Sequence, residues 1–170
     1  MKIAIIGKTG QLASEFFNLK GKDNEWTFLS KKDLDITIKK EVQFFFSKKE
    51  YDIIINCAGY TDVLEAEKNK KKAYAINEKG VKNLILACEN SNCKLIHFST
   101  DYVFEGISKF PYKETDNTNP INNYGKSKEA GEKILLESNI SSLIIRSSWI
   151  YSRFGNNIVK NIIALSKKKI

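Results

Sequence analysis

The fold is decided by one stretch at the amino terminus, Lys2-Ile3-Ala4-Ile5-Ile6-Gly7-Lys8-Thr9-Gly10-Gln11-Leu12-Ala13. It opens with an apolar run of strand length, and the glycines that follow break the strand and begin a helix. Gly7 permits the tight turn, Gly10 lets a diphosphate approach the backbone, and the small Ala13 allows close packing of helix on strand. The free amides and dipole of the helix N-terminus favour a pyrophosphate. The spacing is G-x-x-G-x-x-A rather than G-x-G-x-x-G, so a purely structural turn stays open.

Outward from this turn, short apolar runs alternate with helix-period segments along the chain. Strands are expected at residues 2–6, 26–29, 52–56, 94–98 and 143–146, and helices near residues 10–19, 38–48, 72–90, 122–138 and 156–166. Apolar strands separated by helices predict an α/β fold with a doubly wound parallel sheet, Rossmann-like. We expect the strand order 3-2-1-4-5. The polar loop 105–120 holds both prolines and is long enough to be functional or disordered.

Composition excludes several classes of protein. The chain has 170 residues, 42% hydrophobic and 28% charged, which is typical of one globular domain. It lacks a membrane-length apolar run, a signal-peptide pattern and repeats, so we expect a cytoplasmic protein without membrane contact. Cys57, Cys88 and Cys93 lack metal-ligand spacing and are expected to be buried, reduced thiols. The net charge is +8, but the lysine runs 68–72 and 167–169 lack interleaved aromatics, so nucleic-acid binding is not expected.

The residues after the second expected strand bear on the choice of nicotinamide cofactor. An acidic residue there would hydrogen-bond the adenosine ribose and repel a 2′-phosphate. The run is instead Leu29-Ser30-Lys31-Lys32, with no acid before Asp33, and Lys8 lies inside the glycine turn. These lysines favour NADP(H), and NAD(H) is the alternative if they are ordinary surface charges.

A second group of residues combines a tyrosine, a lysine and an upstream hydroxyl. Tyr124 and Lys128 are four residues apart in an expected helix, so they share one helix face. An ammonium beside the phenol would lower the pKa of Tyr124 from about 10, and a tyrosine so tuned can pass a proton to a carbonyl oxygen. Thr100 follows closely after the fourth expected strand, at the edge where doubly wound proteins bind ligands, and can donate to the same oxygen. His97, the only histidine, is expected to be packed in the core.

Three motifs follow one another along the chain: Gly7-Lys8-Thr9-Gly10-Gln11-Leu12-Ala13, Ser99-Thr100-Asp101-Tyr102-Val103-Phe104 and Asn123-Tyr124-Gly125-Lys126-Ser127-Lys128. Their combination resembles the extended short-chain dehydrogenase/reductase superfamily and, within it, the dTDP-4-dehydrorhamnose reductase family. The segments Asn56-Cys57-Ala58-Gly59-Tyr60-Thr61 and Arg146-Ser147-Ser148-Trp149-Ile150-Tyr151 extend the resemblance over the whole chain. It implies an NADP-dependent oxidoreductase that reduces the 4-keto group of dTDP-4-dehydro-L-rhamnose, giving dTDP-L-rhamnose for cell-surface polysaccharide synthesis.

The resemblance also implies roles for individual residues. Catalytic positions are the hydroxyl of Thr100, the proton donor Tyr124 and the ribose-binding Lys128. Tyr124 and Lys128 are also cofactor-binding positions, and the resemblance adds Gly7, Gly10, Gln11, Leu12, Asp35, Ile36, Ala58, Gly59, Tyr60 and Asn77. Lys8 is included because it lies inside the glycine turn. Substrate-binding positions are Thr100, Asp101 and Trp149, and no metal site is implied.

The chain departs from the family pattern in sequence and in length. Gly59, Tyr60 and Leu64 stand where the family usually has alanine, histidine and often aspartate, which puts fine substrate selectivity in question. Family members are longer, so residues 1–170 are expected to be the NADP(H)-binding domain of a two-domain reductase. The full-length reductase is expected to be a candidate homodimer. Two other functions stay open: a non-catalytic, cofactor-binding regulatory protein on the same scaffold, and a reductase or epimerase of another nucleotide sugar.

Overall fold

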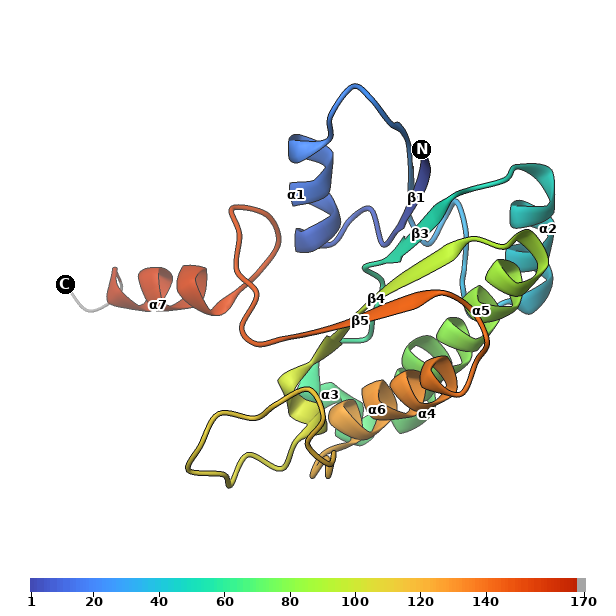
Figure 1. The fold of residues 1–170 in the computed structure, drawn as a ribbon. Helices are drawn as coiled ribbons and strands as arrows, with labels where there is room; N and C mark the ends of the chain where they lie inside the picture. Colours follow the sequence, from blue (N-terminus) through green and yellow to red (C-terminus); the bar gives the residue numbers. More distant parts are fainter. Residues whose placement is uncertain (168–170) are drawn as a thin grey trace.

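The computed structural model describes residues 1–167, which form a five-stranded parallel sheet between helices (Figure 1). The strands are β1 (Lys2–Ile6), β2 (Glu25–Leu29), β3 (Ile53–Asn56), β4 (Lys94–Thr100) and β5 (Ser142–Ser147). The helices are α1 (Gln11–Leu19), α2 (Lys39–Lys48), α3 (Val63–Lys68), α4 (Lys70–Tyr74), the π turn η1 (Ala75–Lys79), α5 (Gly80–Ser91), the 3-10 turn η2 (Asp101–Val103), α6 (Asn123–Leu136) and α7 (Ile158–Ser166). The predicted doubly wound α/β class is confirmed. Lys168 and Lys169, part of the second lysine run, lie outside the described residues.

The predicted strand order, 3-2-1-4-5, is wrong. The sheet has the order β2-β1-β3-β4-β5, so β3 lies beside β1 and not beyond β2. The burial of the two strands explains why. In β3, Ile54, Ile55 and Asn56 are all buried, and such a strand needs neighbours on both sides. In β2 only Leu29 is buried, which suits the edge position that it takes.

Alternate residues of β1 enter the two layers of the core. Ala4 and Ile6 pack in the larger cluster, with side chains of α2, α5 and α6. Ile3 and Ile5 pack in a smaller cluster with Ala13 of α1 on the opposite face. The parallel pairing of β1 with β2 and β3 sets its direction, and its carboxyl end leads into the glycine turn.

The helical stretch predicted at residues 72–90 begins earlier and is not uniform. It runs from α4 through η1 into α5, and the short helix α3 precedes it. The π turn brings the carbonyl oxygen of Asn77 so close to α6 that a β-carbon at Gly131 would overlap it. Glycine therefore lets α6, the helix that carries the Tyr124–Lys128 pair, lie directly against the π turn.

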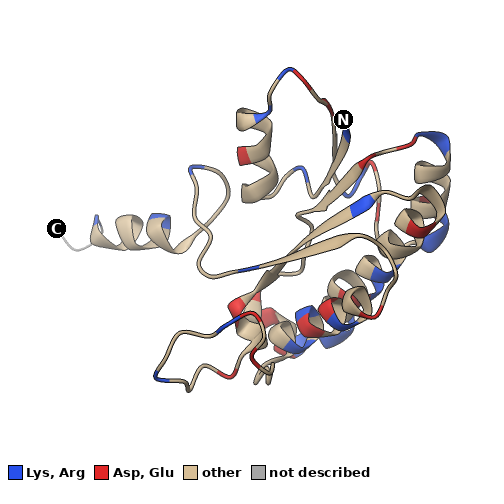
Figure 2. Ribbon diagram, in the orientation of Figure 1, with Lys and Arg blue, Asp and Glu red and all other residues tan. Residues whose placement is uncertain are grey.

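The carboxyl-terminal helix α7 extends away from the sheet (Figure 1). None of its residues is buried, and its apolar side chains Ile158, Ile162, Ile163 and Leu165 are exposed. Lysines and arginines are spread over several elements, with acidic residues among them (Figure 2). None of the helices in residues 1–167 is both long and apolar enough to span a membrane.

Candidate active site

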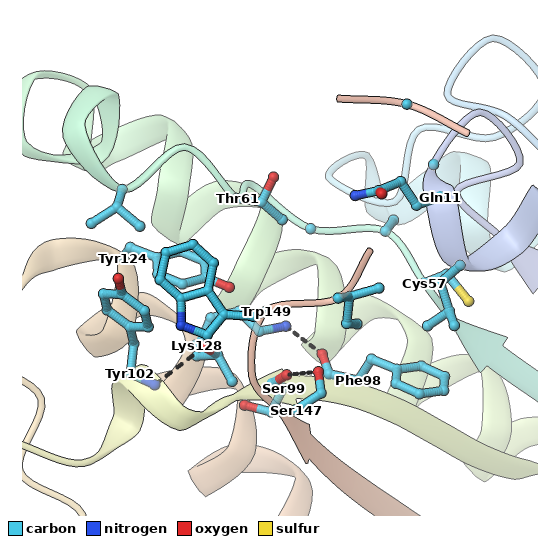
Figure 3. Close-up of a pocket in the computed structure, with 18 of the residues that line it drawn as sticks. Gln11, Cys57, Thr61, Phe98, Ser99, Tyr102, Tyr124, Lys128, Ser147 and Trp149 are labelled. Carbon is cyan, nitrogen blue, oxygen red and sulfur yellow. Dashed lines mark hydrogen bonds between the residues drawn. The ribbon is translucent and has the colours of Figure 1, made fainter. Parts of the chain in front are cut away.

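A pocket of about 500 Å³ opens at the carboxyl ends of the strands (Figure 3). Its walls come from five places in the chain: the glycine turn, the segment after β3, the end of β4, the start of α6 and the segment after β5. The carboxyl edge of a doubly wound sheet is where such folds bind their ligands. Residues far apart in sequence meet here because parallel strands all end at the same edge.

The glycine turn forms one wall of this pocket. Gly7 has a φ of +89°, and a β-carbon there would lie 2.8 Å from the amide nitrogen of Ala58, so both backbone conformation and space require glycine. Gly10 is the N-cap of α1, and no side chain caps this helix. The first amides of α1 therefore face the pocket without helical partners, as a bound pyrophosphate would require.

A second cavity of about 220 Å³ continues from the first across the turn. Both cavities are lined by Gly10, Ala58 and Gly59, and the second also by Asp35 and Ile36. Together they make an extended cleft with uncapped helix amides at its middle. The residues present therefore fit a dinucleotide whose pyrophosphate crosses the glycine turn.

Thr100, Tyr124 and Lys128 come together in the larger cavity. Asn122 caps α6 by accepting a hydrogen bond from the amide of Gly125, 2.7 Å long, which fixes the turn that carries Tyr124. The predicted lowering of the Tyr124 pKa is not found. Burial raises the pKa of Tyr124, and a hydrogen bond with Thr100 only partly opposes this. The phenol is thus held in its protonated form.

Lys128 is directed at β4 rather than at the phenol. Its Nζ donates a 2.6 Å hydrogen bond to the carbonyl oxygen of Phe98 and lies 3.3 Å from Nε2 of His97. The side chain is only 4% exposed, and burial lowers the pKa of Lys128 to about 8. The spacing of four had suggested that the ammonium would lower the pKa of Tyr124. It does not, because Nζ is directed at Phe98 and His97 and not at the phenol.

The sequence matches the family model described as the RmlD substrate binding domain over residues 1–169. The chain belongs to the RmlD substrate binding domain family. It is 38% identical to dTDP-4-dehydrorhamnose reductase of Aggregatibacter actinomycetemcomitans, over 99% of this chain and 58% of that protein. It is 42% identical to the solved dTDP-4-dehydrorhamnose reductase of Clostridium acetobutylicum, with a TM-score of 0.95 over 99% of this chain and 60% of that one. The reductase of Bacillus anthracis, solved in complex with NADP, is 40% identical, with a TM-score of 0.96 and the same coverage.

The resemblance read from the motifs is thereby confirmed at the level of the RmlD family. The chain spans about 60% of the length of these relatives. Its match to the two solved reductases includes the whole of the sheet described above, since 99% of the chain is covered.

Most of the cofactor and substrate positions predicted for this RmlD-family chain line one cavity or the other. The larger cavity takes Gly10, Gln11, Leu12, Ala58, Gly59, Thr100, Asp101, Tyr124, Lys128 and Trp149, and the smaller one takes Gly7, Gly10, Asp35, Ile36, Ala58 and Gly59. Lys8, Tyr60 and Asn77 line neither. Asn77 is buried and clasps the backbone of Tyr60, accepting from its amide at 2.8 Å and donating to its carbonyl at 3.0 Å. Asn77 therefore holds the segment after β3 in place through its backbone and does not itself line a cavity.

The smaller cavity holds Asp35 and Ile36, which were predicted to bind the cofactor, and its neighbours bear on the choice between NADP(H) and NAD(H). Asp33 is folded back on Ser30, whose amide and hydroxyl donate to its carboxylate at 2.8 and 2.7 Å. Lys31 lines the smaller cavity and pairs with Asp35 at 3.3 Å. The carboxylate of Asp33, the first acid after β2, is therefore engaged by hydrogen bonds within its own turn. The charged residue nearest before it in sequence that lines the cavity is the lysine Lys31.

Three features of the pocket were not predicted from its motifs: the place of Ser147, a contact of Gln11 and the backbone of Trp149. Ser147 ends β5 and lines the pocket, and the carboxyl-edge rule that found Thr100 could have found it too. Gln11 accepts a 2.9 Å hydrogen bond from Asn157, which ties the start of α7 to the glycine turn across 146 residues. No local pattern predicts such a contact. Trp149 lines the pocket with a φ of 48°, a backbone conformation that is rare for a bulky residue.

Proposed function

We propose that this chain provides the NADP(H)-binding domain and the proton donor of a reductase that acts on the 4-keto group of dTDP-4-dehydro-L-rhamnose. The observation that carries the proposal is the meeting of Thr100, Tyr124 and Lys128 at one end of a cleft whose middle is an uncapped helix N-terminus. The reductases named above support the choice of substrate, and the one solved with NADP supports the choice of cofactor.

When bound, NADPH supplies the hydride. The chain's own part is to hold a proton at the phenolic oxygen of Tyr124 and to deliver it to the carbonyl oxygen of the sugar. Because burial raises the pKa of Tyr124, the phenol carries its proton at neutral pH. Thr100, 5% exposed and lining the same cavity as Tyr124, orients the same oxygen. Lys128 holds the ribose of the cofactor.

The sugar nucleotide needs contacts that the pocket of this chain supplies only in part. We propose that Asp101 and Trp149 meet the sugar, because both line the cavity beside Thr100. Trp149 is 65% exposed, so one face of this pocket is open. Residues 1–170 are then the cofactor domain of a two-domain reductase, and the 170-residue polypeptide should bind NADPH weakly without measurable turnover, since catalysis requires the carbonyl to be held near the cofactor.

Tyr124→Phe in the full-length protein tests the proposal. We expect kcat to fall by about two to four orders of magnitude, the usual contribution of a positioned proton donor, while the Kd for NADPH stays near that of the unmodified protein. Tyr102→Phe is the matched control, because Tyr102 lines the same pocket and its ring lies 5.7 Å from that of Tyr124. Retained turnover in Tyr124→Phe would remove the residue from this role. NADPH binding without any oxidation in the unmodified protein would favour the regulatory alternative.

A further inference from the structure

His97 is a buried titratable residue that the proposed mechanism does not use. It is fully buried in β4, and each of its ring nitrogens has a polar neighbour. Nε2 lies 3.3 Å from Nζ of Lys128, and Nδ1 lies 3.0 Å from Nδ2 of Asn56. These three side chains form a buried row from the end of β3 through β4 to α6.

The hydrogen atoms in this row are fixed from the Asn56 end. The backbone amide of Ala58 donates to Oδ1 of Asn56 at 3.1 Å, and a backbone N–H cannot accept. The amide nitrogen of Asn56 must therefore face His97. Because that NH₂ group is only a donor, Nδ1 of His97 must accept, and the proton of the neutral imidazole must sit on Nε2.

The consequence falls on Lys128. With its hydrogen on Nε2, His97 presents a donor to Nζ, whereas an ammonium has three donors and no lone pair. A neutral amine satisfies every group: it accepts from His97, donates to the carbonyl oxygen of Phe98 and keeps one N–H for the pocket. The protonated form leaves two donors facing each other in a buried place, which is costly.

We propose that His97 is a positioning residue which, as the Nε2-protonated imidazole imposed by Asn56 and Ala58, favours the amine form of Lys128 and makes its proton labile. The inference deepens the proposed function, on which it rests, by assigning a group that sets the state of the ribose-binding lysine. Lys128 then exchanges its proton in the working pH range and does not remain a permanent cation.

The charges around Lys128 are consistent with this. Burial lowers the pKa of Lys128 to about 8, and Glu132 opposes that shift. Burial, and then Lys128, lower the pKa of His97 well below its usual value, so the imidazole itself stays neutral. The other titratable groups that line the pocket are Tyr124 on α6, Asp101 and Tyr102 on η2, and Cys57 after β3. Glu132, on the same helix as Lys128, pairs with Arg146 of β5.

Nitrogen NMR of the 170-residue chain, labelled with ¹⁵N-histidine and free of cofactor, tests the inference directly. His97 is the only histidine, so its two ring nitrogens need no assignment by mutation. We expect a neutral, Nε2-protonated ring throughout the range from about pH 6 to about pH 9. We also expect an inflection of the Nε2 shift near pH 8, where Lys128 titrates, that is absent in Lys128→Met. An Nδ1-protonated ring, or an imidazolium at neutral pH, would overturn the proposal.

Asn56→Asp provides a second test, in the opposite direction. A carboxylate can accept from both Ala58 and His97, so the hydrogen should move to Nδ1 and leave Nε2 as an acceptor for the Lys128 ammonium. The expected readout is a reversal of the tautomer and a rise in the pH of the inflection by about one pH unit, a tenfold change in proton affinity. An unchanged tautomer would contradict the inference. Neither measurement involves substrate or turnover, so the outcome is independent of the proposed reductase activity.

Discussion

Arg146→Met should destabilise this fold more than Glu132→Gln, a change to its buried partner. Nη2 of Arg146 donates to the carboxylate of Glu132 at 2.7 Å, and the single Nε–H is shared between its two oxygens at 3.1 and 3.2 Å. Nη1 donates to the carbonyl oxygen of Glu114 at 3.2 Å. The side chain of Glu132 is 2% exposed and that of Arg146 is 21% exposed. The pair joins α6 to β5, one helical turn beyond Lys128.

The difference in burial sets the magnitudes. Without Arg146, a fully buried carboxylate has lost its partner, and the free energy of unfolding should fall by about 3–5 kcal/mol. Glu132→Gln leaves a guanidinium that water can reach and an amide oxygen that still accepts, so the loss should be about 1–2 kcal/mol. The double variant with methionine at both positions has no buried charge, and should lie within about 2 kcal/mol of the unmodified protein.

Urea denaturation at neutral pH, followed by circular dichroism, measures all three variants in the same way. A smaller loss for Arg146→Met than for Glu132→Gln, or a double variant as unstable as Arg146→Met alone, would refute the reasoning.

Three further predictions concern the cleft and the packing around it. Lys31→Glu should raise the Kd for NADPH about tenfold and leave that for NADH nearly unchanged, as measured by fluorescence titration, since it replaces the cation at the adenosine cavity. Gly131→Ala should lower the free energy of unfolding by about 1–3 kcal/mol in urea, because its β-carbon overlaps a carbonyl oxygen of the π turn. Gly21→Ala, at a position with open space, should change it by less than about 0.5 kcal/mol. Burial raises the pKa of Cys57 to about 12, so iodoacetamide at pH 8 should leave this thiol unlabelled until the chain is unfolded, as mass spectrometry would show.

The strands and most of the site were predictable because their signals are local. Each predicted strand lies within two residues of an observed one at either end, since every strand carries its own apolar run. Thr100, Tyr124 and Lys128 were found for a similar reason, from a strand end and a spacing of four. The direction of Lys128 was not predictable in this way. It depends on a buried acceptor of β4, the carbonyl oxygen of Phe98, that only the folded sheet brings near.

Strand order is a long-range property, and it decides whether the site can exist. In the predicted order, 3-2-1-4-5, the segment after β3 would lie beyond β2, on the far side of the glycine turn from Lys128. The segment after β3 was also expected to bind the cofactor together with Lys128. The predicted strand order and this predicted site are therefore incompatible with each other. In the observed sheet β3 lies between β1 and β4, so Ala58 meets Gly7 on one side, and a β-carbon at Gly59 would lie 3.9 Å from Nζ of Lys128 on the other. The switch in winding direction falls between β1 and β3, and this is where the two cavities share their walls. The glycine turn, the row from Asn56 to Lys128 and the carboxyl end of β4 are neighbours because of that one crossover.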